Sequence, residues 1–531
     1  MMAIGLMLSV MSLFPVACYS GKVLVLHPAV STTSHILAMR TLVDDLAARG
    51  HQGDTRGHWG TPDHKGTPGD TSVATASYML VMRTLSNHLA IRVNQVKNIF
   101  IFPHNAVWDK GLSLFGIPPN GFITISEMCK TLFQQKDMIK HFRDTQFDVA
   151  IVDLMYNECS LMLAHNLGVP IVGFWAYIVN GVNGLYTQAF NPLAISPVMM
   201  SQLPRSMGFL QRVYNYVFAT IGHAIIQIQF FVTESVAQTH LGHGPGPAAI
   251  LANLSGMLIN AQPPIIQPWL LPTNFIPVGG FHIREEKPLP KVLESWIDGS
   301  GMHGTVIFSL GSSFDPKSAP SRFIQKLLTA FGKLKQRVIM RYGGIPVSMN
   351  IPSNVKLLDW LPQRDILANP NVVLFVTHCG IFGVLEALHH GIPLVCMPIF
   401  GDQMENLQRL RELGLVVQFK KTSSADEIYN ALIEGLSNPQ YKEAADQMSS
   451  HLRSLPIPPL QQATWLLEHV MNTSGAHHYK IPAQHLNSLQ YFGLDVVAFF
   501  LIIIFVMARL LYKCFVKLFL RNMNKGKLKE S

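Results

Sequence analysis

Short apolar runs alternate with helix-like segments through the C-terminal half of the chain. Each run has four to six residues and is rich in Val, Ile and Leu, which is typical of strands buried on both faces of a sheet. The runs cover residues 305–310, 338–341, 355–358, 372–377 and 394–397. This order of strands and helices predicts a parallel sheet with helices on both faces.

The N-terminal half begins with the same pattern. An apolar run over residues 23–26 predicts a strand, and a polar loop separates it from a helix predicted over residues 34–49. Four apolar residues share one face of that helix: Ile36, Met39, Val43 and Leu46. With 531 residues the chain is too long for a single core, so we predict an α/β protein of two lobes with a cleft between them.

Residues 51–92 interrupt this pattern. Residues 52–75 are rich in Gly, Thr, Asp and His and have almost no apolar periodicity. Residues 77–92 then repeat residues 34–49 at an offset of 43, with nine of 16 positions identical. We favour a duplicated exon over a natural insertion that forms a surface loop and an extra helix. On either interpretation, the N-terminal lobe is expected to lack part of its sheet.

Both ends of the chain carry an apolar segment. Residues 3–17 form a short apolar run, and small residues suited to cleavage follow it, which predicts a signal peptide over residues 1–20. Residues 496–508 are wholly apolar, and the run continues past Arg509 to residue 512. These 17 residues span about 25 Å as a helix, which is short but sufficient to cross a membrane.

The net charge of +9 is concentrated at the C-terminus. From Arg509 onward, seven basic residues and one acidic residue contribute +6, so the rest of the chain is near neutral and gives no reason to expect a nucleic-acid partner. The positive-inside rule places the basic tail in the cytosol and the bulk of the chain across the membrane. Lys527 and Lys529 resemble the dilysine signal for retention in the endoplasmic reticulum, with a tail of solvated lysines as the alternative.

Six cysteines are scattered along the chain. Cys18 would leave with the signal peptide, and Cys514 would face the cytosol. No close-spaced pair suggests a zinc site or a disulfide framework, so neither is predicted.

Residues 360–403 contain four groups of residues that indicate one ligand. A strand that ends in a glycine-containing turn before a helix suits a diphosphate, because glycines let the backbone approach and the helix N-terminus favours an anion. An aromatic and an amide before the strand can stack on a base and hold a sugar hydroxyl, and an acid–amide pair after it can bind further hydroxyls. The residues of this predicted nucleotide-sugar site are Trp360, Gln363, His378, Gly380, Gly383, Glu386, Asp402 and Gln403.

This segment resembles the signature of the UDP-glycosyltransferases, the family that includes the animal UDP-glucuronosyltransferases. Phe-Ser-Leu-Gly-Ser at 308–312, Val-Gly-Gly at 278–280, Lys-Pro-Leu-Pro at 287–290 and the membrane anchor also stand in the family's order. The resemblance implies a GT-B fold, with two Rossmann-like lobes and a cleft between them, plus a C-terminal transmembrane helix.

The resemblance also implies a division of the chain into domains. We expect a signal peptide (1–20), an N-terminal acceptor-binding lobe (21–285, with 52–92 anomalous), a C-terminal UDP-sugar-binding lobe (286–455), return helices to the N-terminal lobe (456–493), a transmembrane helix (494–512) and a cytosolic basic tail (513–531).

Transfer of a sugar to a hydroxyl group requires a base. His35 lies just after a strand, at the start of a helix, and imidazole can accept a proton near neutral pH. Asp153 ends the strand-like run 147–152, where a carboxylate can fix the tautomer of the imidazole and stabilise the imidazolium. Both positions match the family's catalytic pair. From the residues alone, a packed histidine and a strand-end cap remain the alternatives.

By resemblance, five residues are expected to hold the nucleoside and the transferred sugar. Trp360 should stack on the uracil, Gln363 and Glu386 should bind ribose hydroxyls, and Asp402 and Gln403 should bind the transferred sugar. Core packing of Trp360 and solvation of Glu386 on a helix surface are the alternatives.

The resemblance assigns the diphosphate to His378 and to the backbone around Gly380 and Gly383, with Ser309 and Gly311 approaching from the facing loop. The site segment contains no Asp-x-Asp element suited to Mg²⁺ or Mn²⁺, so we expect no metal and no cofactor besides the UDP-sugar co-substrate.

Phe382 departs from the family pattern, because many relatives carry there a polar Asn that can reach a phosphate. A phenylalanine cannot donate that hydrogen bond. We expect donor binding to be weaker by roughly 1 kcal/mol, the worth of one ordinary hydrogen bond.

The function implied is an inverting, metal-independent UDP-glycosyltransferase of the endoplasmic reticulum membrane, single-pass type I with lumenal lobes. Its implied partners are a UDP-sugar, a small lipophilic acceptor and membrane lipid, with a homo- or hetero-oligomer left open. Arg364 is the only arginine between Trp360 and His378 that could meet a sugar carboxylate, so we favour UDP-glucose, with UDP-glucuronate as the alternative. A rival hypothesis is a catalytically impaired relative that binds UDP-sugar or associates with active transferases.

Overall fold

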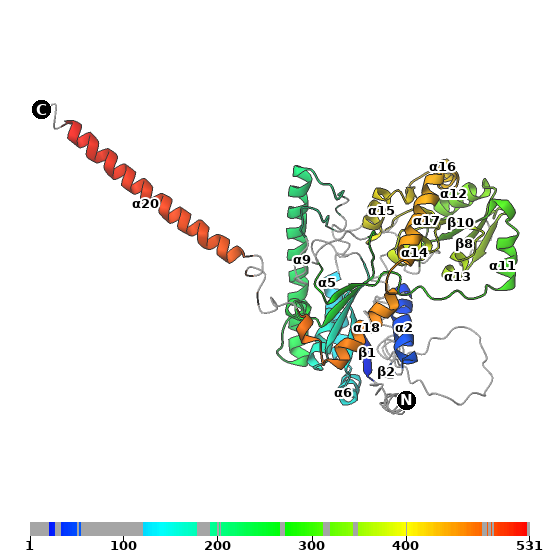
Figure 1. The fold of residues 1–531 in the computed structure, drawn as a ribbon, viewed down its shortest axis with the longest axis horizontal. Coiled ribbons are helices and arrows are strands. Elements are labelled where there is room, and N and C mark those ends of the chain that lie inside the picture. The colour runs from blue at the N-terminus through cyan, green and yellow to red at the C-terminus, as the bar shows by residue number, and fades with distance from the viewer. Residues whose placement is uncertain are drawn as a thin grey trace, which may run out of the picture.

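A computed structural model shows two parallel six-stranded sheets among the described residues, one in each half of the chain (Figure 1). The described residues are 21–26, 33–49, 52–54, 121–177, 192–198, 201, 203–265, 271–311, 319–342, 349–399, 401–480, 486, 490 and 493–527. The predicted α/β class with two lobes is confirmed.

The N-terminal sheet has the strand order β2-β1-β3-β4-β5-β6. Its strands are β1 (Lys22–Leu26), β2 (Gln52–Asp54), β3 (Val149–Asp153), β4 (Ile171–Trp175), β5 (Gly256–Ile259) and β6 (Phe275–Pro277). The helix predicted after β1 is α2 (Thr33–Ala48), and Met39, Val43 and Leu46 on its apolar face are buried. Residue Leu26 pairs with Val152, so the chain leaves β1 and β3 at neighbouring points of one sheet edge.

The C-terminal sheet has the strand order β12-β11-β10-β7-β8-β9. Its strands are β7 (Thr305–Ser309), β8 (Arg337–Arg341), β9 (Val355–Leu358), β10 (Val372–Thr377), β11 (Leu394–Cys396) and β12 (Val416–Gln418). All five strands predicted in this half are present, and β12 is an addition at the edge.

Helices cover both faces of the C-terminal sheet. Val306 and Phe308 pack into one apolar cluster with α12 (Ser321–Gly332) and α16 (Ala425–Ser437). Ile307, between them in β7, belongs to a second cluster that continues into the N-terminal lobe. Since successive strand residues point to opposite faces, this burial on both sides explains why the strands read as unbroken apolar runs.

The remaining helices of the described lobes lie between strands or follow the last strand. In the N-terminal half they are α5 (Gly121–Phe133), α6 (Lys136–Thr145), α7 (Glu158–Asn166), α9 (Phe209–Leu241) and α10 (Pro247–Leu251). In the C-terminal half they are α11 (Lys291–Asp298), η1 (Gly301–His303), α13 (Gln363–Leu367), α14 (Ile381–His389), α15 (Gln403–Glu412), α17 (Pro439–Arg453) and η3 (His477–Tyr479).

Helix α18 (Pro459–Asn472) brings the chain back to the N-terminal lobe, where it contacts α2, β3, β5 and β6 (Figure 1). The hydroxyl of Thr464 donates a 2.8 Å hydrogen bond to Oδ2 of Asp45 in α2. This packing ties the C-terminal end of the second lobe to the first lobe.

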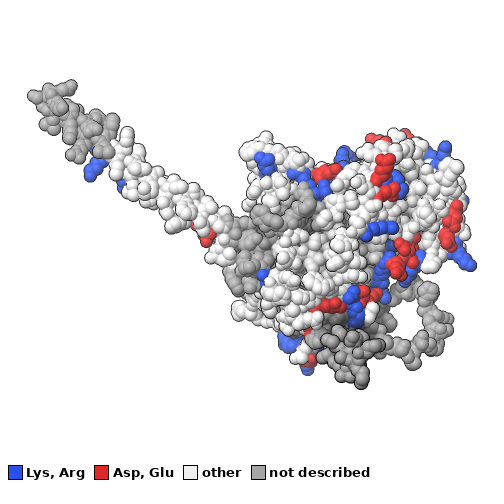
Figure 2. Space-filling view, in the orientation of Figure 1, with Lys and Arg blue, Asp and Glu red and all other residues white. Residues whose placement is uncertain are grey.

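Helix α20 (Leu494–Lys527) extends away from both lobes (Figure 1). Its residues 494–517 form a candidate membrane span with no buried residues, and Figure 2 shows few charged side chains on the described part of this rod. Helix α9 is also long and apolar enough by composition, but a third of its most apolar window is buried, and α9 packs on α5 and α7. The signal peptide and Lys529 lie outside the described residues.

The expectation that the N-terminal lobe lacks part of its sheet is wrong for residues 52–54, which form strand β2. Strand β2 pairs in parallel with β1 at the sheet edge, with Gln52 opposite Lys22 and Asp54 opposite Leu24. An edge strand pairs through main-chain groups on one side, so it forms without an apolar pattern. The repeat at residues 77–92 lies outside the described residues.

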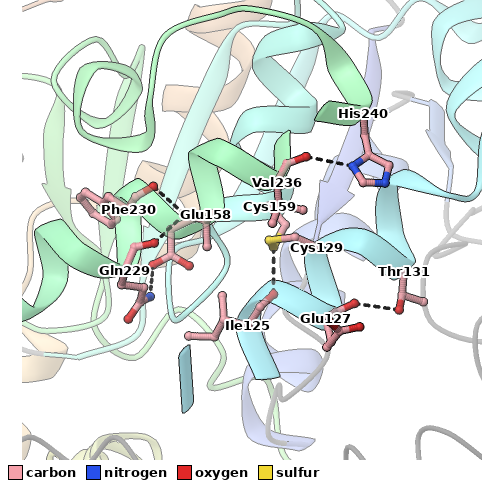
Figure 3. Close-up of a disulfide and its surroundings, with 11 residues drawn as sticks. Ile125, Glu127, Cys129, Thr131, Glu158, Cys159, Gln229, Phe230, Val236 and His240 are labelled. Carbon is pink, nitrogen blue, oxygen red and sulfur yellow. Dashed lines mark hydrogen bonds between the residues drawn. A yellow bond between two sulfur atoms is a disulfide. The ribbon is translucent and has the colours of Figure 1, made fainter. Parts of the chain in front are cut away.

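The expectation of no disulfide framework is also wrong. Cys129 of α5 is bonded to Cys159 of α7 (Figure 3), and Cys379, which follows β10, is bonded to Cys396 at the end of β11. The partners are 30 and 17 residues apart in sequence. They meet because α5 packs on α7 and because β10 and β11 are neighbouring strands, which spacing alone does not reveal.

Candidate active site

A buried histidine–aspartate pair lies at the edge where β1 and β3 end. Nδ1 of His35 is 2.7 Å from Oδ2 of Asp153, and the two side chains are only 3% and 1% exposed. His35 belongs to the first turn of α2, and Asp153 is the last residue of β3. The backbone N–H of Met155 donates to Oδ1 of Asp153 at 3.1 Å, so both carboxylate oxygens have partners. The pair therefore has the geometry of a base and the group that orients it.

Aromatic rings surround the imidazole of His35. Phe174 and Tyr177 of the N-terminal lobe lie edge-on, with centroids 6.4 and 5.9 Å away. The ring of Phe382, from the first turn of α14 in the other lobe, lies 5.4 Å away. The predicted departure at Phe382 is thus in direct contact with the predicted base.

Two glycines surround the imidazole of His378, which follows β10. A Cβ atom on Gly311 would lie 2.5 Å from Cε1 of His378, and one on Gly380 would lie 2.6 Å from its Nε2. Gly311 also has a φ of +73°, which favours glycine. Ser309 at the end of β7 is buried, and its Oγ accepts a 3.3 Å hydrogen bond from the Gly311 N–H. The structure therefore brings together four of the five residues predicted around the diphosphate.

Arg341, at the end of β8, adds a cation to this region. Its guanidinium donates to the carbonyl oxygen of Gly311 and lies 5.1 Å from the ring centroid of Trp360. Burial lowers the pKa of His378 to about 4, and the charge of Arg341 acts in the same direction. The imidazole of His378 is therefore neutral at physiological pH, and Arg341 supplies the positive charge. The Trp360 ring is 53% exposed, which leaves a face open for stacking.

Gln363 and Glu386 meet, although 23 residues separate them. Nε2 of Gln363, the first residue of α13, donates a 2.7 Å hydrogen bond to Oε2 of Glu386 in α14. Gly383 allows this approach, because a Cβ atom there would lie 3.2 Å from the same Nε2. Burial raises the pKa of Glu386 to about 7, opposed by the hydrogen bond from Gln363 and by the charge of Arg364.

Asp402 and Gln403 stand at the N-terminus of α15. Asn406 donates through Nδ2 to Oδ2 of Asp402 at 2.6 Å and to the carbonyl of Cys379 at 2.9 Å, so it joins Asp402 to the glycine turn. Burial raises the pKa of Asp402 to about 6, against the hydrogen bond from Asn406 and the charge of His35. Gln403 is buried, and its Oε1 accepts a 2.7 Å hydrogen bond from the Ile399 N–H.

The predicted catalytic pair of the N-terminal lobe and the predicted donor-site residues of the C-terminal lobe therefore lie next to each other. Tyr177 lies between them: burial raises its pKa well above the ordinary value, and the charges of Asp402 and Asp153 add to the shift. The sequence alone did not indicate four further residues near this site, which are Tyr177, Arg341, Asn406 and His282. Arg341 ends β8 and Tyr177 lies two residues after β4, at the carboxyl ends of strands where ligands bind in such folds, and this rule applied to every strand would have indicated both. His282 lies five residues after β6 and Asn406 lies within α15, so the rule would have missed these two.

The chain is similar to known proteins along most of its length. The model of the UDP-glucoronosyl and UDP-glucosyl transferase family matches residues 21–529. The chain is 32% identical over 495 residues to UDP-glucuronosyltransferase 1A5 of Rattus norvegicus, which covers 93% of this chain and 91% of that protein. It is 29% identical over 520 residues to UDP-glucuronosyltransferase 2A3 of Homo sapiens, with 96% of each chain covered.

Solved structures share the fold at low sequence identity. The spinosyn forosaminyltransferase SpnP is 15% identical with a TM-score of 0.53, covering 85% of this chain and 99% of that one. The glycotransferase of kitacinnamycin is 18% identical with a TM-score of 0.52, covering 85% and 98%. These neighbours are GT-B glycosyltransferases, so the predicted GT-B fold is confirmed.

Proposed function

Since this chain belongs to the UDP-glucoronosyl and UDP-glucosyl transferase family and is a UDP-glycosyltransferase, we propose that it transfers a hexose to a hydroxyl group of a small lipophilic acceptor, with inversion at the anomeric carbon. The observation that carries this proposal is the buried His35–Asp153 pair, with a 2.7 Å contact, at the edge that faces the second lobe. Phe382 of that lobe contacts the same imidazole, so the base and the donor segment share one site.

The proposed reaction begins with His35. Because Nδ1 is held by Asp153, Nε2 takes the proton of the acceptor hydroxyl as its oxygen attacks the anomeric carbon. The bond from that carbon to the diphosphate oxygen breaks, and UDP leaves with the electron pair. Attack from the face opposite the leaving group inverts the configuration. The proton ends on His35, and Asp153 stabilises the imidazolium.

On the donor side, we propose that Trp360 stacks on the uracil and that Gln363 and Glu386 bind ribose hydroxyls. The exposed face of Trp360 and the 2.7 Å contact between the other two residues support these roles. Asp402 and Gln403 would then bind the transferred sugar.

We propose that the leaving diphosphate needs no metal. Neutral His378 can donate a hydrogen bond to it, and Gly311 and Gly380 leave room for this imidazole. Backbone N–H groups of the turn around Gly380 can donate to the diphosphate as well. The N-terminus of α14 and the guanidinium of Arg341 can offset the negative charge. Phosphate charge is stabilised by such dipoles and cations in other folds.

The identity of the hexose depends on a cation near the sugar. Arg364 is the arginine that the sequence offered as a partner for a sugar carboxylate. In the structure its guanidinium already donates a 2.9 Å hydrogen bond to the carbonyl oxygen of His282. Arg341 lies outside residues 360–403 in the sequence, but in the structure it lies beside Trp360 and His378 and is a second cation of the donor site. Because the relatives are named UDP-glucuronosyltransferases, we propose UDP-glucuronate as the first donor to test, with UDP-glucose as the alternative.

We propose that α20 anchors the protein in the endoplasmic reticulum membrane as a single-pass type I protein, with both lobes in the lumen. The basic residues after Arg509 support a cytosolic tail. The two buried disulfides, Cys129–Cys159 and Cys379–Cys396, support an oxidising compartment for the lobes.

The test uses microsomes that express the full chain, a panel of phenolic acceptors, and radiolabelled UDP-glucuronate or UDP-glucose. Transfer from one donor is expected, and it should disappear in His35→Ala. His451→Ala, which changes an exposed histidine of α17, serves as the matched control and should leave transfer unchanged.

Two results would contradict the proposal. Full transfer by His35→Ala would exclude His35 as the base. No transfer from either donor by a folded protein that binds UDP would favour the catalytically impaired relative instead.

A further inference from the structure

His282 is a buried imidazole without a hydrogen-bond partner. It lies in the turn after β6, close to the linker between the lobes, and is only 6% exposed. Neither Nδ1 nor Nε2 has a hydrogen-bond partner among the described residues. Buried polar atoms in native proteins are almost always paired, so an unpaired one beside a candidate site is a candidate contact for a ligand of that site.

A carboxylate of the candidate donor site lies close to this ring. Nε2 of His282 lies 3.7 Å from Oε1 of Glu386. That distance is too long for a direct hydrogen bond, but it lets both atoms contact one hydroxyl group placed between them. The other oxygen of Glu386, Oε2, is already bound by Gln363 at 2.7 Å, which leaves Oε1 turned toward His282.

Contacts with the C-terminal lobe hold His282 in this position. Arg364, next in sequence to Gln363, donates from Nη1 to the carbonyl oxygen of His282 at 2.9 Å. The ring of Phe382 lies edge-on to the imidazole with a centroid distance of 4.9 Å. The side chain is therefore held in place before any ligand binds, which reduces the entropy lost on binding.

The charge state of the pair selects the kind of ligand. Burial lowers the pKa of His282 to about 3, with the charge of Arg364 acting in the same direction. The backbone of Phe382 opposes this lowering of the pKa, although its position does not allow a well-formed hydrogen bond with the His282 ring. A neutral imidazole is a good partner for a hydroxyl group, which can accept from Nε2–H while it donates to Glu386.

We propose that His282 is a further donor-binding residue that shares one ribose hydroxyl of the UDP-sugar with Glu386. The proposal rests on the proposed function, because it requires the UDP-sugar to bind along Gln363 and Glu386. It extends the donor site to the turn that follows the last strand of the N-terminal lobe.

The test measures binding of UDP, 2′-deoxy-UDP and 3′-deoxy-UDP to the full chain in detergent micelles by calorimetry. His282→Phe keeps a ring against Phe382 and removes both nitrogens, and it should weaken UDP binding roughly three- to tenfold. One of the deoxy nucleotides should bind wild type and His282→Phe equally, because it lacks the shared hydroxyl. His282→Gln, whose amide can reach the Nε2 position, should retain UDP affinity within about twofold. His303→Phe, at an exposed histidine, should bind all three ligands as the wild type does.

An equal loss for all three ligands in His282→Phe, or no loss for any, would overturn the proposal. If His282→Phe does not fold, His282→Gln and His282→Asn replace it: Asn is too short to reach the Nε2 position, so equal affinity in these two variants also overturns the proposal. A folded wild type that binds no UDP would overturn the proposed function together with this inference. Binding that His282 does not influence would overturn the inference alone.

Discussion

Nδ1 of His35 lies 2.7 Å from Oδ2 of Asp153, although 118 residues separate them in the chain. The parallel pairing of β1 with β3 sets this contact, since Leu26 stands opposite Val152 and both chains leave the sheet at the same edge. A carboxylate in this position fixes the tautomer of the imidazole and stabilises its protonated form.

Asp153→Asn is expected to lower kcat roughly 10³- to 10⁴-fold, because an amide can hold the imidazole in the wrong tautomer. UDP affinity should not change. Steady-state kinetics at saturating donor and calorimetry with UDP measure the two quantities, with Asp144→Asn at an exposed acid of α6 as the control. If the losses in Asp153→Asn and His35→Ala multiply in the double variant, the two residues do not act as a unit.

UDP-glucose binding is expected to strengthen as the pH rises from 6 to 8. Burial raises the pKa of Glu386 to about 7, and only the ionised carboxylate accepts from ribose hydroxyls without first losing a proton. Below this pKa the proton must leave on binding, so affinity should increase about tenfold over the range. UDP-glucose is the suitable ligand because its diphosphate does not titrate there. Glu386→Gln should remove this increase between pH 6 and 8, and an increase of the same size in the variant would assign it to another group.

Phe382→Asn is expected to raise donor affinity about fivefold and to lower kcat. The new amide can donate the phosphate hydrogen bond that a phenylalanine lacks, worth roughly 1 kcal/mol. The lost ring packs 5.4 Å from the imidazole of His35, so the base should be held less firmly. Phe382→Leu keeps an apolar side chain and should bring no gain. Unchanged or reduced UDP-glucose affinity in Phe382→Asn would refute the idea.

Stability should depend on pH through Glu158, whose Oε1 accepts a 2.5 Å hydrogen bond from Gln229 of α9 beside the first disulfide (Figure 3). Burial raises the pKa of Glu158 from 4.5 to about 7. Between pH 4.5 and about 7, the Glu158 carboxyl keeps its proton in the folded protein but has lost it in the unfolded chain. Stability is therefore fully present below pH 4.5 and falls by roughly 3 kcal/mol as the pH rises through 7.

Glu158→Gln should remove this decrease, because the neutral amide can still accept from Gln229. Melting followed by tryptophan fluorescence should show the variant's Tm above that of the wild type at pH 8 and close to it at pH 4.5. Glu294→Gln, at an exposed acid of α11, should behave as the wild type. Equal pH profiles for Glu158→Gln and the wild type would contradict the prediction.

Loss of the Cys379–Cys396 disulfide should affect both stability and donor binding. Closing a loop of about this length is worth roughly 3 kcal/mol. Cys379, between His378 and Gly380, has a φ of +68°, a backbone conformation that glycine adopts without strain. The double variant Cys379→Gly with Cys396→Ala therefore keeps this conformation accessible while it removes the disulfide that holds the turn. The double variant should lose Tm and bind UDP-glucose less tightly. Removing the Cys129–Cys159 bond should lower Tm without changing that affinity, and equal affinity losses would contradict the assignment.

Prediction from sequence succeeded where burial leaves a local pattern. Strand β10 spans residues 372–377 and β9 spans 355–358, as predicted, because strands of a doubly covered sheet are unbroken apolar runs. It missed β12, which has three residues at a sheet edge and is only partly buried, and β2, whose Gln-Gly-Asp sequence has no apolar pattern. Edge strands are stabilised by main-chain pairing on one side, which side-chain periodicity does not report.

The sequence by itself determined the residue types of the donor segment, the two-lobed α/β pattern and the apolar C-terminal helix, because each depends on neighbours within a few turns or strands. Only the tertiary structure decided that Cys379 pairs with Cys396, that Phe382 packs on His35, and that His282 lies buried beside Glu386. These contacts join residues from different strands or different lobes. Strand order and lobe packing bring them together, and neither is encoded in the spacing of residues along the chain.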